Sequence, residues 1–436
     1  MQGIQQHDET GVKPAQRRRF WRCADRETLR EHQLQRLNRL LADAVAHQPF
    51  YREKYRGVQL PLRSLDELSR LPLLQKPELT SDGAATICGL PTSRYVRVHQ
   101  TSGTTGTPLR LLDTAADWRW WLRCWQYVLD AAEVRRRDVA FMAFSYGPFI
   151  GFWTAHDACV RRGATVVPGG GMNSQMRLNV IQSCQATVLC CTPTYALHLG
   201  SVAEENGIDL SRSSVSRIIV AGEPGGSIPE VRQRIEAIWG ARVIDHTGAT
   251  ELGAWGVGSR DGRGVHVIES EFIAERLVFD EHTPQGRPAE DGELAELIMT
   301  GLGRCGAPAI RYRTGDLVRG RQSDDPENRF LLLDGGVAGR ADSMVVIRGV
   351  NIFPSSIEAI VRRVTGDAEY RVLQSAQQSM AQLRLELETG DGQQELPARL
   401  SDVFRQQLGL RIEVTAVALG TLPRFEAKAK RWIREN

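Results

Sequence analysis

Between residues 139 and 246, short uninterrupted apolar runs alternate with segments of helical spacing, and this rhythm restricts the chain to few folds. A strand that is apolar on both faces is typical of a parallel sheet covered by helices on both sides. We therefore predict an α/β fold with parallel strands. The apolar runs are VAFMAFS (139–145), ATVVP (164–168), ATVLCC (186–191), SRIIVA (216–221) and ARVIDH (241–246).

The pattern changes on both sides of this region. Residues 26–47 have the spacing of one helix. After Gly262 strand follows strand, which predicts an antiparallel, β-barrel-like part. A glycine-rich stretch then marks a hinge, and the last hundred residues have the pattern of a small α+β unit. We predict a large domain over residues 1–338 and a small mobile domain over residues 339–436.

Composition narrows the class of protein. The net charge of +3 is too small to argue for a nucleic-acid or membrane partner. The N-terminus lacks an apolar signal region, and no apolar run reaches the roughly 20 residues that span a bilayer. The eight cysteines include no CxxC pair and no zinc-like spacing, which fits a reducing cytosol. We expect a soluble cytoplasmic protein.

The most informative segment is QTSGTTGTP at residues 100–108. Its glycines lie among hydroxyl residues, so the loop offers backbone N–H and O–H donors that can surround phosphate oxygens. The GK[ST] ending of a Walker A loop is absent. For an arbitrary stretch of this composition, a polar surface loop is the alternative. The candidate phosphate contacts are Ser102, Gly103, Thr104, Thr105, Gly106 and Thr107.

Further motifs follow in a fixed order, and together with that loop they resemble the signatures of the adenylate-forming superfamily. The segment PFYREKY (49–55) and the chain ending are similar to the phenylacetate–CoA ligase family. The superfamily motifs run from about residue 95 to the end of the chain. The motifs are AGEP (221–224), DHTGATE (245–251), YRTGD (312–316), GRAD (339–342), RGVNIFP (348–354) and PRFEAKAKR (423–431).

The resemblance implies the nucleotide-binding residues. Asp245 would lie near the adenine amino group, and Asp316 would accept hydrogen bonds from both ribose hydroxyls. Arg340 would donate to ribose or phosphate oxygens. Gly222, Glu223 and Pro224 would line the adenine and acyl pocket. The 102–107 loop would hold the phosphates, and His246 and Thr247 are also implied in nucleotide binding.

The resemblance also implies the catalytic residues. Thr250 would contact the α-phosphate, and Glu251 would bind Mg²⁺, which prefers oxygen ligands. Lys428 would stabilise the charge that develops at the α-phosphorus during adenylation. Asp342 would be the hinge about which the small domain rotates between the two half-reactions.

Three positions depart from the superfamily pattern. Thr107 stands where many relatives carry lysine, and Ala427 replaces the usual glycine before the catalytic lysine. Thr247 stands where a tyrosine usually packs on the adenine, which removes a stacking surface. His246 or another residue would have to take that place, or nucleotide affinity would be weaker.

The acyl pocket is less well defined. Tyr146 and Phe149, with Phe152 and Trp153, could bound a flat aromatic acid, although ordinary core packing is the alternative. Gly248 and Ala249 are expected to line the same pocket. The tryptophans at 118, 120, 121 and 125 have the pattern of a packed stripe rather than a ligand cage. His266 lies where some relatives bind structural zinc, but no cysteine cluster accompanies it, so we predict no zinc.

We predict an ATP-dependent acid–CoA ligase that forms an acyl-AMP intermediate from an aromatic or arylalkyl acid. Its ligands would be that acid, ATP, Mg²⁺ and CoA, and the resemblance implies a homodimer. One alternative is transfer of the acyl group to a carrier-protein thiol or an amine. A second is a nucleotide-binding regulatory protein without catalysis, supported only by Thr247 and opposed by Lys428, Glu251 and Asp316.

Overall fold

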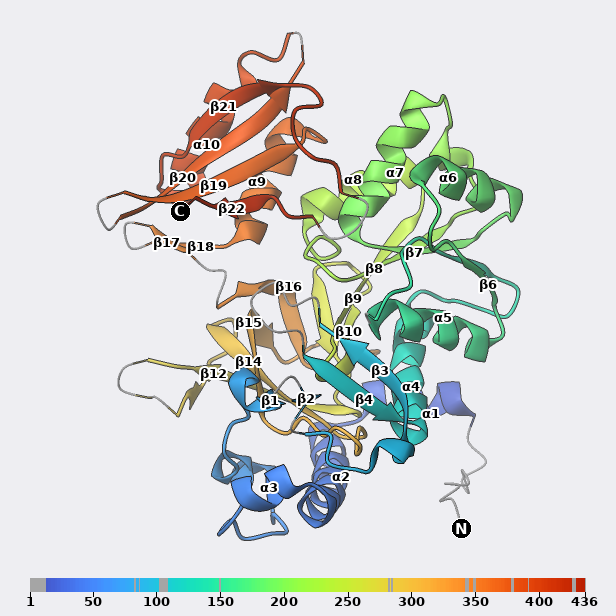
Figure 1. The fold of residues 1–436 in the computed structure, drawn as a ribbon, viewed down its shortest axis with the longest axis vertical. Helices are drawn as coiled ribbons and strands as arrows, with labels where there is room; N and C mark the ends of the chain where they lie inside the picture. Colours follow the sequence, from blue (N-terminus) through green and yellow to red (C-terminus); the bar gives the residue numbers. More distant parts are fainter. Residues whose placement is uncertain are drawn as a thin grey trace.

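The computed structural model consists of a large body and a smaller terminal domain, which lies beside helices α7 (Pro193–Glu205) and α8 (Pro229–Trp239) of the body (Figure 1). The boundary predicted at residues 338/339 falls within strand β16 (Leu332–Arg340), which belongs to the body, and it stays a prediction. The structure describes residues 13–81, 84–85, 87–101, 109–148, 150–280, 283, 285–341, 345–347, 350–377, 380–390, 392–425 and 429–435.

A parallel sheet forms the centre of the body, as predicted. Its inner strands are buried on both faces, and their successive residues contribute to two different cores, whereas the edge strand at Thr165–Pro168 is partly exposed. Phe141, Leu189 and Val243 pack on one side, whereas Met142 and Ile244 pack on the other. This alternation is why each strand is apolar throughout. The strands are β5 (Val139–Met142), β6 (Thr165–Pro168), β7 (Val188–Cys191), β8 (Arg217–Val220) and β9 (Arg242–Ala249), in the spatial order β6-β5-β7-β8-β9.

Helices cover both faces of this sheet. Helix α8 begins at a proline, which suits the first turn, and ends at Gly240 in the left-handed conformation. Its N-terminal neighbour α7 has its first turn capped by the Thr192 side chain, which accepts from the Tyr195 N–H. The covering helices are α4 (Ala115–Ala131), α5 (Ile150–Arg162), α6 (Ser174–Ser183), α7 (Pro193–Glu205) and α8 (Pro229–Trp239).

The antiparallel strands continue the same sheet through β9, so one sheet of twelve strands crosses the body. Residues up to Asp245 pair in parallel with β8, and residues from His246 onward pair antiparallel with β10. The antiparallel strands are β10 (Gly253–Gly258), β11 (Gly264–Val267), β12 (Phe272–Val278), β13 (Arg287–Pro288), β14 (Leu294–Gly301), β15 (Tyr312–Arg321) and β16. The predicted mixed class is confirmed, and the antiparallel part continues the parallel sheet.

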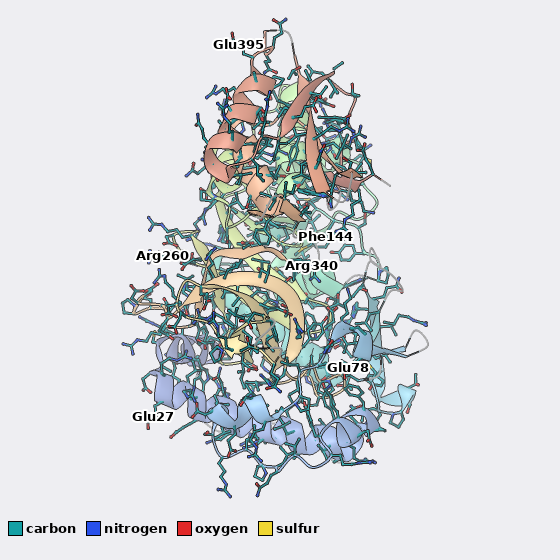
Figure 2. The ribbon with its side chains drawn as sticks, turned by 90° about the vertical axis from the view of Figure 1, so that its left-hand side faces the viewer. Glu27, Glu78, Phe144, Arg260, Arg340 and Glu395 are labelled. Atoms are coloured by element: carbon teal, nitrogen blue, oxygen red, sulfur yellow. The ribbon has the colours of Figure 1, made fainter. Side chains whose placement is uncertain are left out.

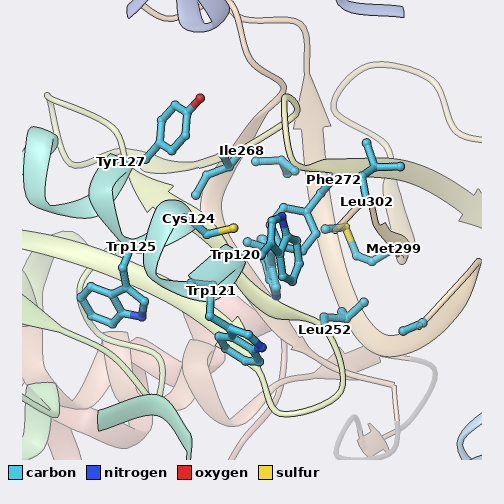
Figure 3. Packing of buried hydrophobic residues seen from close by; sticks show 14 of the residues in the cluster. Trp120, Trp121, Cys124, Trp125, Tyr127, Leu252, Ile268, Phe272, Met299 and Leu302 are labelled. Carbon is cyan, nitrogen blue, oxygen red and sulfur yellow. The ribbon is translucent and has the colours of Figure 1, made fainter. Parts of the chain in front are cut away.

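Helix α4 joins the two halves of the sheet through its aromatic side chains (Figure 3). Trp120 packs on Phe272 with ring centroids 5.2 Å apart, and its indole N–H donates to Glu271. Trp118, Trp121 and Trp125 are also buried, so the predicted packed stripe is confirmed. These rings are core.

The N-terminal segment wraps the end of the body opposite the terminal domain (Figure 1). The predicted helix over 26–47 is confirmed as α2 (Arg26–His47), which the Asp25 side chain caps. Other elements of this region are α1 (Pro14–Cys23), α3 (Pro49–Lys54), the short β1 (Thr80–Ser81) and β2 (Ala84–Ala85), and the hairpin of β3 (Tyr95–Gln100) and β4 (Arg110–Thr114). Single 3-10 turns lie at Leu65–Arg70, Lys76–Leu79, Thr92–Arg94 and Leu210–Arg212.

The terminal domain has its own hydrophobic core, with Ile357, Leu385 and Phe404 at its centre. A sheet in the order β21-β20-β19-β22 packs against two helices and a hairpin. Its elements are β17 (Val345–Ile347), β18 (Val350–Ile352), α9 (Pro354–Thr365), β19 (Tyr370–Gln377), β20 (Met380–Thr389), α10 (Leu396–Leu408), β21 (Glu413–Ala418) and β22 (Trp432–Arg434). In the described part of the chain, no helix has both the length and the apolar character of a membrane span.

Candidate active site

The carboxyl ends of the parallel strands gather the predicted motifs at one edge of the sheet. The loop at 221–224 follows β8, and Asp245 is the last residue of β9 that pairs in parallel. The loop at 143–148 follows β5, and the N-terminus of α7 follows β7. Parallel α/β sheets bind their ligands at this edge. The topology therefore brings together residues that the sequence spreads over more than a hundred positions.

Asp245 is buried at the centre of this edge. The Ser227 hydroxyl donates to its Oδ2 at 2.5 Å, and burial raises the pKa of Asp245 to about 6. A Cβ atom at Gly226 would lie only 2.5 Å from the Asp245 carboxyl carbon, so the approach of this loop requires glycine.

The next residue, His246, points to the other face of β9. Its Nδ1 lies 2.8 Å from the Gly256 carbonyl oxygen, and its ring packs on Trp125 with centroids 4.3 Å apart. Burial lowers the pKa of His246 to about 4. The imidazole is thus part of the core, and it offers the adenine no stacking surface. Thr247, half-buried, is the next residue on the face of Asp245.

Thr250 and Glu251 follow β9, and the Arg304 side chain bonds to their backbone carbonyls. The Arg304 Nη1 donates to the carbonyl oxygen of Thr250 at 2.7 Å and to that of Glu251 at 3.2 Å. The Tyr312 hydroxyl donates to Glu251 Oε1 at 3.4 Å. Two buried side chains therefore fix the backbone and the carboxylate of this segment.

Arg304 belongs to a buried ionic group that sequence reasoning missed. Its Nε donates to Asp113 Oδ1 at 2.8 Å, and His99 Nδ1 lies 3.5 Å from Asp113 Oδ2. Burial alone would raise the pKa of Asp113, but Arg304 and His99 outweigh burial and hold that pKa below its ordinary value. Because β3 and β4 carry His99 and Asp113, the group ties the hairpin around residues 102–108 to the Thr250–Glu251 segment.

Asp316 and Arg340 face each other on β15 and β16. Arg340 Nη1 donates to Asp316 Oδ1 and to the Thr314 carbonyl oxygen, both at 3.2 Å. Gly315 has a φ of +74°, a left-handed conformation that favours glycine and turns the strand toward the site. Arg340 and Phe144 lie at the level where the terminal domain meets the body (Figure 2).

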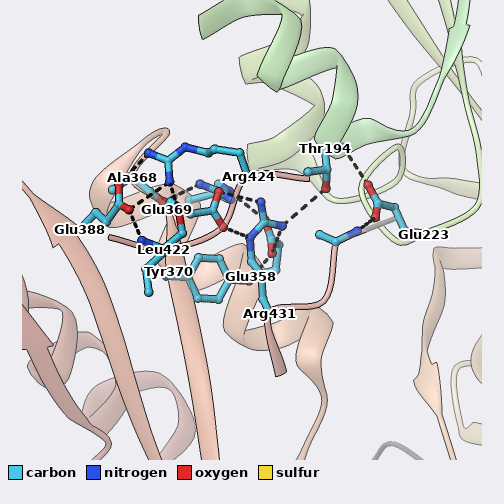
Figure 4. A network of polar contacts seen from close by, with 12 residues as sticks. Thr194, Glu223, Glu358, Ala368, Glu369, Tyr370, Glu388, Leu422, Arg424 and Arg431 are labelled. Carbon is cyan, nitrogen blue, oxygen red and sulfur yellow. Dashed lines mark hydrogen bonds and ion pairs between the residues drawn. The ribbon is translucent and has the colours of Figure 1, made fainter. Parts of the chain in front are cut away.

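Glu223 links the site to the terminal domain. Its Oε1 accepts from the Thr194 N–H at 2.8 Å, and its Oε2 accepts from the Ala429 N–H at 3.1 Å (Figure 4). Gly222, which precedes it, has a φ of +94°. Sequence reasoning assigned Glu223 to the pocket wall; its contact with the terminal segment gave no signal in the sequence.

The aromatic residues after β5 form a cluster with α5. The Tyr146 ring lies 4.7 Å from Trp153 and 5.8 Å from His156, measured between centroids, and it contacts Phe144 at 5.5 Å. The Gln100 N–H donates to the Pro148 carbonyl oxygen at 2.9 Å, which joins this loop to the β3–β4 hairpin. Gly248 is exposed and Ala249 half-buried at the end of β9.

Several predicted site residues lie outside the described residues. They are Ser102, Gly103, Thr104, Thr105, Gly106, Thr107, Phe149, Asp342 and Lys428. The two residues that flank the 102–108 loop are described, and the Thr101 N–H donates to the Leu109 carbonyl oxygen at 2.9 Å. The roles of these residues stay predictions.

No group of three or more metal-ligating side chains occurs within the described ranges. His266, considered for zinc, is buried, and its Nδ1 lies 3.1 Å from the Phe330 carbonyl oxygen. Glu251 is different, because it follows β9 at the ligand edge of the sheet, where the residue as a whole is 9% exposed. One carboxylate beside nucleotide phosphates is a donor set that suits Mg²⁺.

Comparisons with known proteins agree with this geometry. Residues 93–299 match the AMP-binding enzyme family, and residues 349–435 match the AMP-binding enzyme C-terminal domain. A phenylacetate-coenzyme A ligase of Pseudomonas putida is 30% identical over 420 residues, which cover 92% of this chain and 93% of that protein.

A solved 2-hydroxyisobutyryl-CoA ligase was compared in two states. In its postadenylation state with an acyl-AMP, it has a TM-score of 0.88 and 25% identity, covering 98% of this chain and 95% of its own. In its thioesterification state with CoA, the TM-score is 0.71 at 26% identity, with the same coverage. Since one protein gives both scores, the difference reflects how the parts are arranged. The present chain superposes more completely on the first state than on the second.

Proposed function

Because this chain belongs to the phenylacetate–CoA ligase family of AMP-binding enzymes, we propose that it is an AMP-forming ligase for an aromatic or arylalkyl carboxylic acid. The acid carboxylate would attack the α-phosphorus of ATP and release pyrophosphate. The CoA thiol would then attack the acyl carbon of the acyl-AMP and release AMP. The observation that carries the proposal is the convergence of Asp245, Thr250–Glu251 and Asp316–Arg340 at one sheet edge, with the terminal segment joined to it.

The chain's own residues would act mainly by position and charge. Asp245 and Asp316 would orient the adenine and the ribose. Arg340, which bonds to Asp316, would donate to ribose or phosphate oxygens when the nucleotide is bound. Lys428 would neutralise charge that develops at the α-phosphate, where a compact ammonium fits a crowded site.

Glu251 would hold Mg²⁺ at the phosphates. Arg304 and Tyr312 support this role, because they fix the carbonyls and the carboxylate of the segment in a preformed geometry. Mg²⁺, when bound, supplies neutralisation of phosphate charge. Preorganised groups are effective since they need no rearrangement during the reaction.

The aromatic cluster supports an aromatic substrate. Tyr146, Trp153 and Phe144 present ring faces and edges beside the ligand edge of the sheet, where a flat ring can stack. The Tyr146 hydroxyl is buried without a hydrogen-bond partner among the described residues. A phenyl or arylalkyl group could pack against these rings, and a hydrogen-bonding group on the substrate could reach the hydroxyl.

The proposal is tested by acid-dependent ATP–pyrophosphate exchange over a panel of aromatic, arylalkyl and aliphatic acids. We expect exchange with arylalkyl acids and AMP release that requires CoA. Lys428→Ala should lower exchange at least about 10²–10³-fold, whereas Lys430→Ala, at an exposed neighbour, should stay near wild type.

Two results would change the assignment. If no aromatic acid supports exchange, the substrate class is wrong. If exchange occurs but CoA is not consumed, the acceptor is a carrier-protein thiol or an amine.

A further inference from the structure

The Glu223 carboxylate is shared between the two domains. One oxygen accepts from the Thr194 N–H in the first turn of α7, and the other accepts from the Ala429 N–H of the terminal segment. The α7 N-terminus carries partial positive charge, so it holds the carboxylate in place. Each oxygen therefore has a backbone donor from a different domain, and Ala429 directly follows Lys428 in the chain.

Arg431 makes the second link, two residues further on. Its Nε donates to Glu369 Oε1 at 2.5 Å within the terminal domain, and its Nη1 reaches Thr194 Oγ1 at 3.5 Å across the interface (Figure 4). The Arg431 side chain is only 10% exposed. Thr194 is thus contacted through its backbone by Glu223 and through its hydroxyl by Arg431.

We propose that Glu223 and Arg431 are positioning residues for the adenylation half-reaction, which hold the terminal segment against the α7 N-terminus and release it before thioester formation. The inference rests on the proposed function, since it assigns these contacts to the placement of Lys428. Two links on either side of residue 430 fix the backbone next to the lysine. They occur in a structure that superposes more completely on the postadenylation state of the solved ligase than on its thioesterification state.

A general domain contact would be the competing explanation, and the chain offers a matched control. Arg363 of α9 pairs with Glu230 of α8 at 2.9 Å, which joins the same two domains away from the terminal segment. If any interdomain contact served adenylation, loss of this pair would have the same effect as loss of Glu223.

The main variant is Glu223→Gln, because an amide can accept from only one of the two N–H groups and turns a donor toward the other. We expect kcat for ATP–pyrophosphate exchange to fall about tenfold, as for one lost hydrogen bond to a charged group. Conversion of supplied acyl-adenylate and CoA to thioester should stay within about twofold of wild type. Glu230→Gln should leave both half-reactions within about twofold.

A measurement independent of activity separates this inference from the proposed function. Amide hydrogen exchange of the peptide containing Ala429–Arg431 should be faster in Glu223→Gln and unchanged in Glu230→Gln. If wild type shows no acid-dependent pyrophosphate exchange, the proposed function fails while this readout still tests the link.

The inference is overturned by unchanged amide protection in Glu223→Gln, by equal losses in both half-reactions, or by equal effects of the two variants. Arg431→Lys is a second test of the same link, since it keeps the charge and loses the planar fork. We expect the ATP–pyrophosphate exchange rate of Arg431→Lys to lie between the rates of wild type and Glu223→Gln.

Discussion

The two sides of the candidate site are built on different physical principles. On the body side, Arg304, Asp113 and Tyr312 are buried and hold the Thr250–Glu251 segment through fixed hydrogen bonds. On the terminal side, the described links to the body include polar pairs that reach the solvent, such as the half-exposed pair of Arg363 and Glu230. Burial makes the first side rigid and costly to disturb, whereas the second can be broken and remade. A site that serves two half-reactions needs both a rigid side and a side whose contacts can be broken and remade.

The largest effect is expected where the terminal side supplies chemistry. Lys428→Arg keeps the charge but replaces a compact ammonium with a broad planar fork, so adenylation should fall about 10²–10³-fold. Pyrophosphate exchange measures this step, and thioester formation from supplied acyl-adenylate should be largely retained. Adenylation close to wild type would show that the body side alone suffices.

On the body side, the largest effect is expected on stability. Arg304→Met removes a buried cation and leaves the buried Asp113 carboxylate without its arginine partner, which should lower the free energy of unfolding by about 3–5 kcal/mol. Urea unfolding measures it. Adding Asp113→Asn to the same chain should restore part of the loss, because the remaining charge is then removed. A loss below about 1 kcal/mol would contradict the difference drawn between the two sides.

A pH-dependent effect is expected at Asp245, whose pKa is raised to about 6 by burial. Between pH 4 and 6 the native state holds this proton more tightly than the unfolded chain does. Wild type should therefore lose stability relative to Asp245→Asn as pH rises through this window, and the difference should be constant above it.

Roughly 3 kcal/mol is the upper bound for this difference, from about 1.4 kcal/mol per pKa unit. Urea unfolding of both proteins at pH 4 and pH 7 measures it. Parallel stability curves would show that Asp245 is not held in its neutral form by burial.

The smallest effect is expected at the control pair. Glu230→Gln removes an ion pair whose arginine side chain is 47% exposed, so the free energy of unfolding should change by less than about 1 kcal/mol. Thermal and urea unfolding measure it. A larger loss of unfolding free energy would show that the terminal side is held as firmly as the body side.

The parallel sheet could be predicted because burial on both faces is written into consecutive residues. The end of β5 could not be predicted. The strand ends at Met142, three residues before the apolar run does, because the apolar residues that follow belong to the aromatic loop. The continuation of the sheet through β9 also escaped prediction, since hydrophobic patterns do not show which strands are neighbours.

The site was predictable where a local motif carries it. Asp245 lies where the parallel pairing of β9 ends, and Asp316 faces Arg340 across β15 and β16, while the roles of these residues at the nucleotide stay predictions. Arg304 carried no signal, because a buried arginine looks like a surface one until its partner is known. The same holds for the Glu223–Ala429 hydrogen bond, which joins residues 206 positions apart.

The tryptophan distribution has a spectroscopic consequence. Of the nine tryptophans, eight lie in the body, including the four buried on α4, and Trp432 alone lies in the terminal domain, one residue after Arg431. Intrinsic fluorescence will thus report melting of the body almost exclusively, whereas far-ultraviolet circular dichroism weighs both parts by their peptide content. The gap between the two apparent melting temperatures is a label-free gauge of how independently the terminal domain melts.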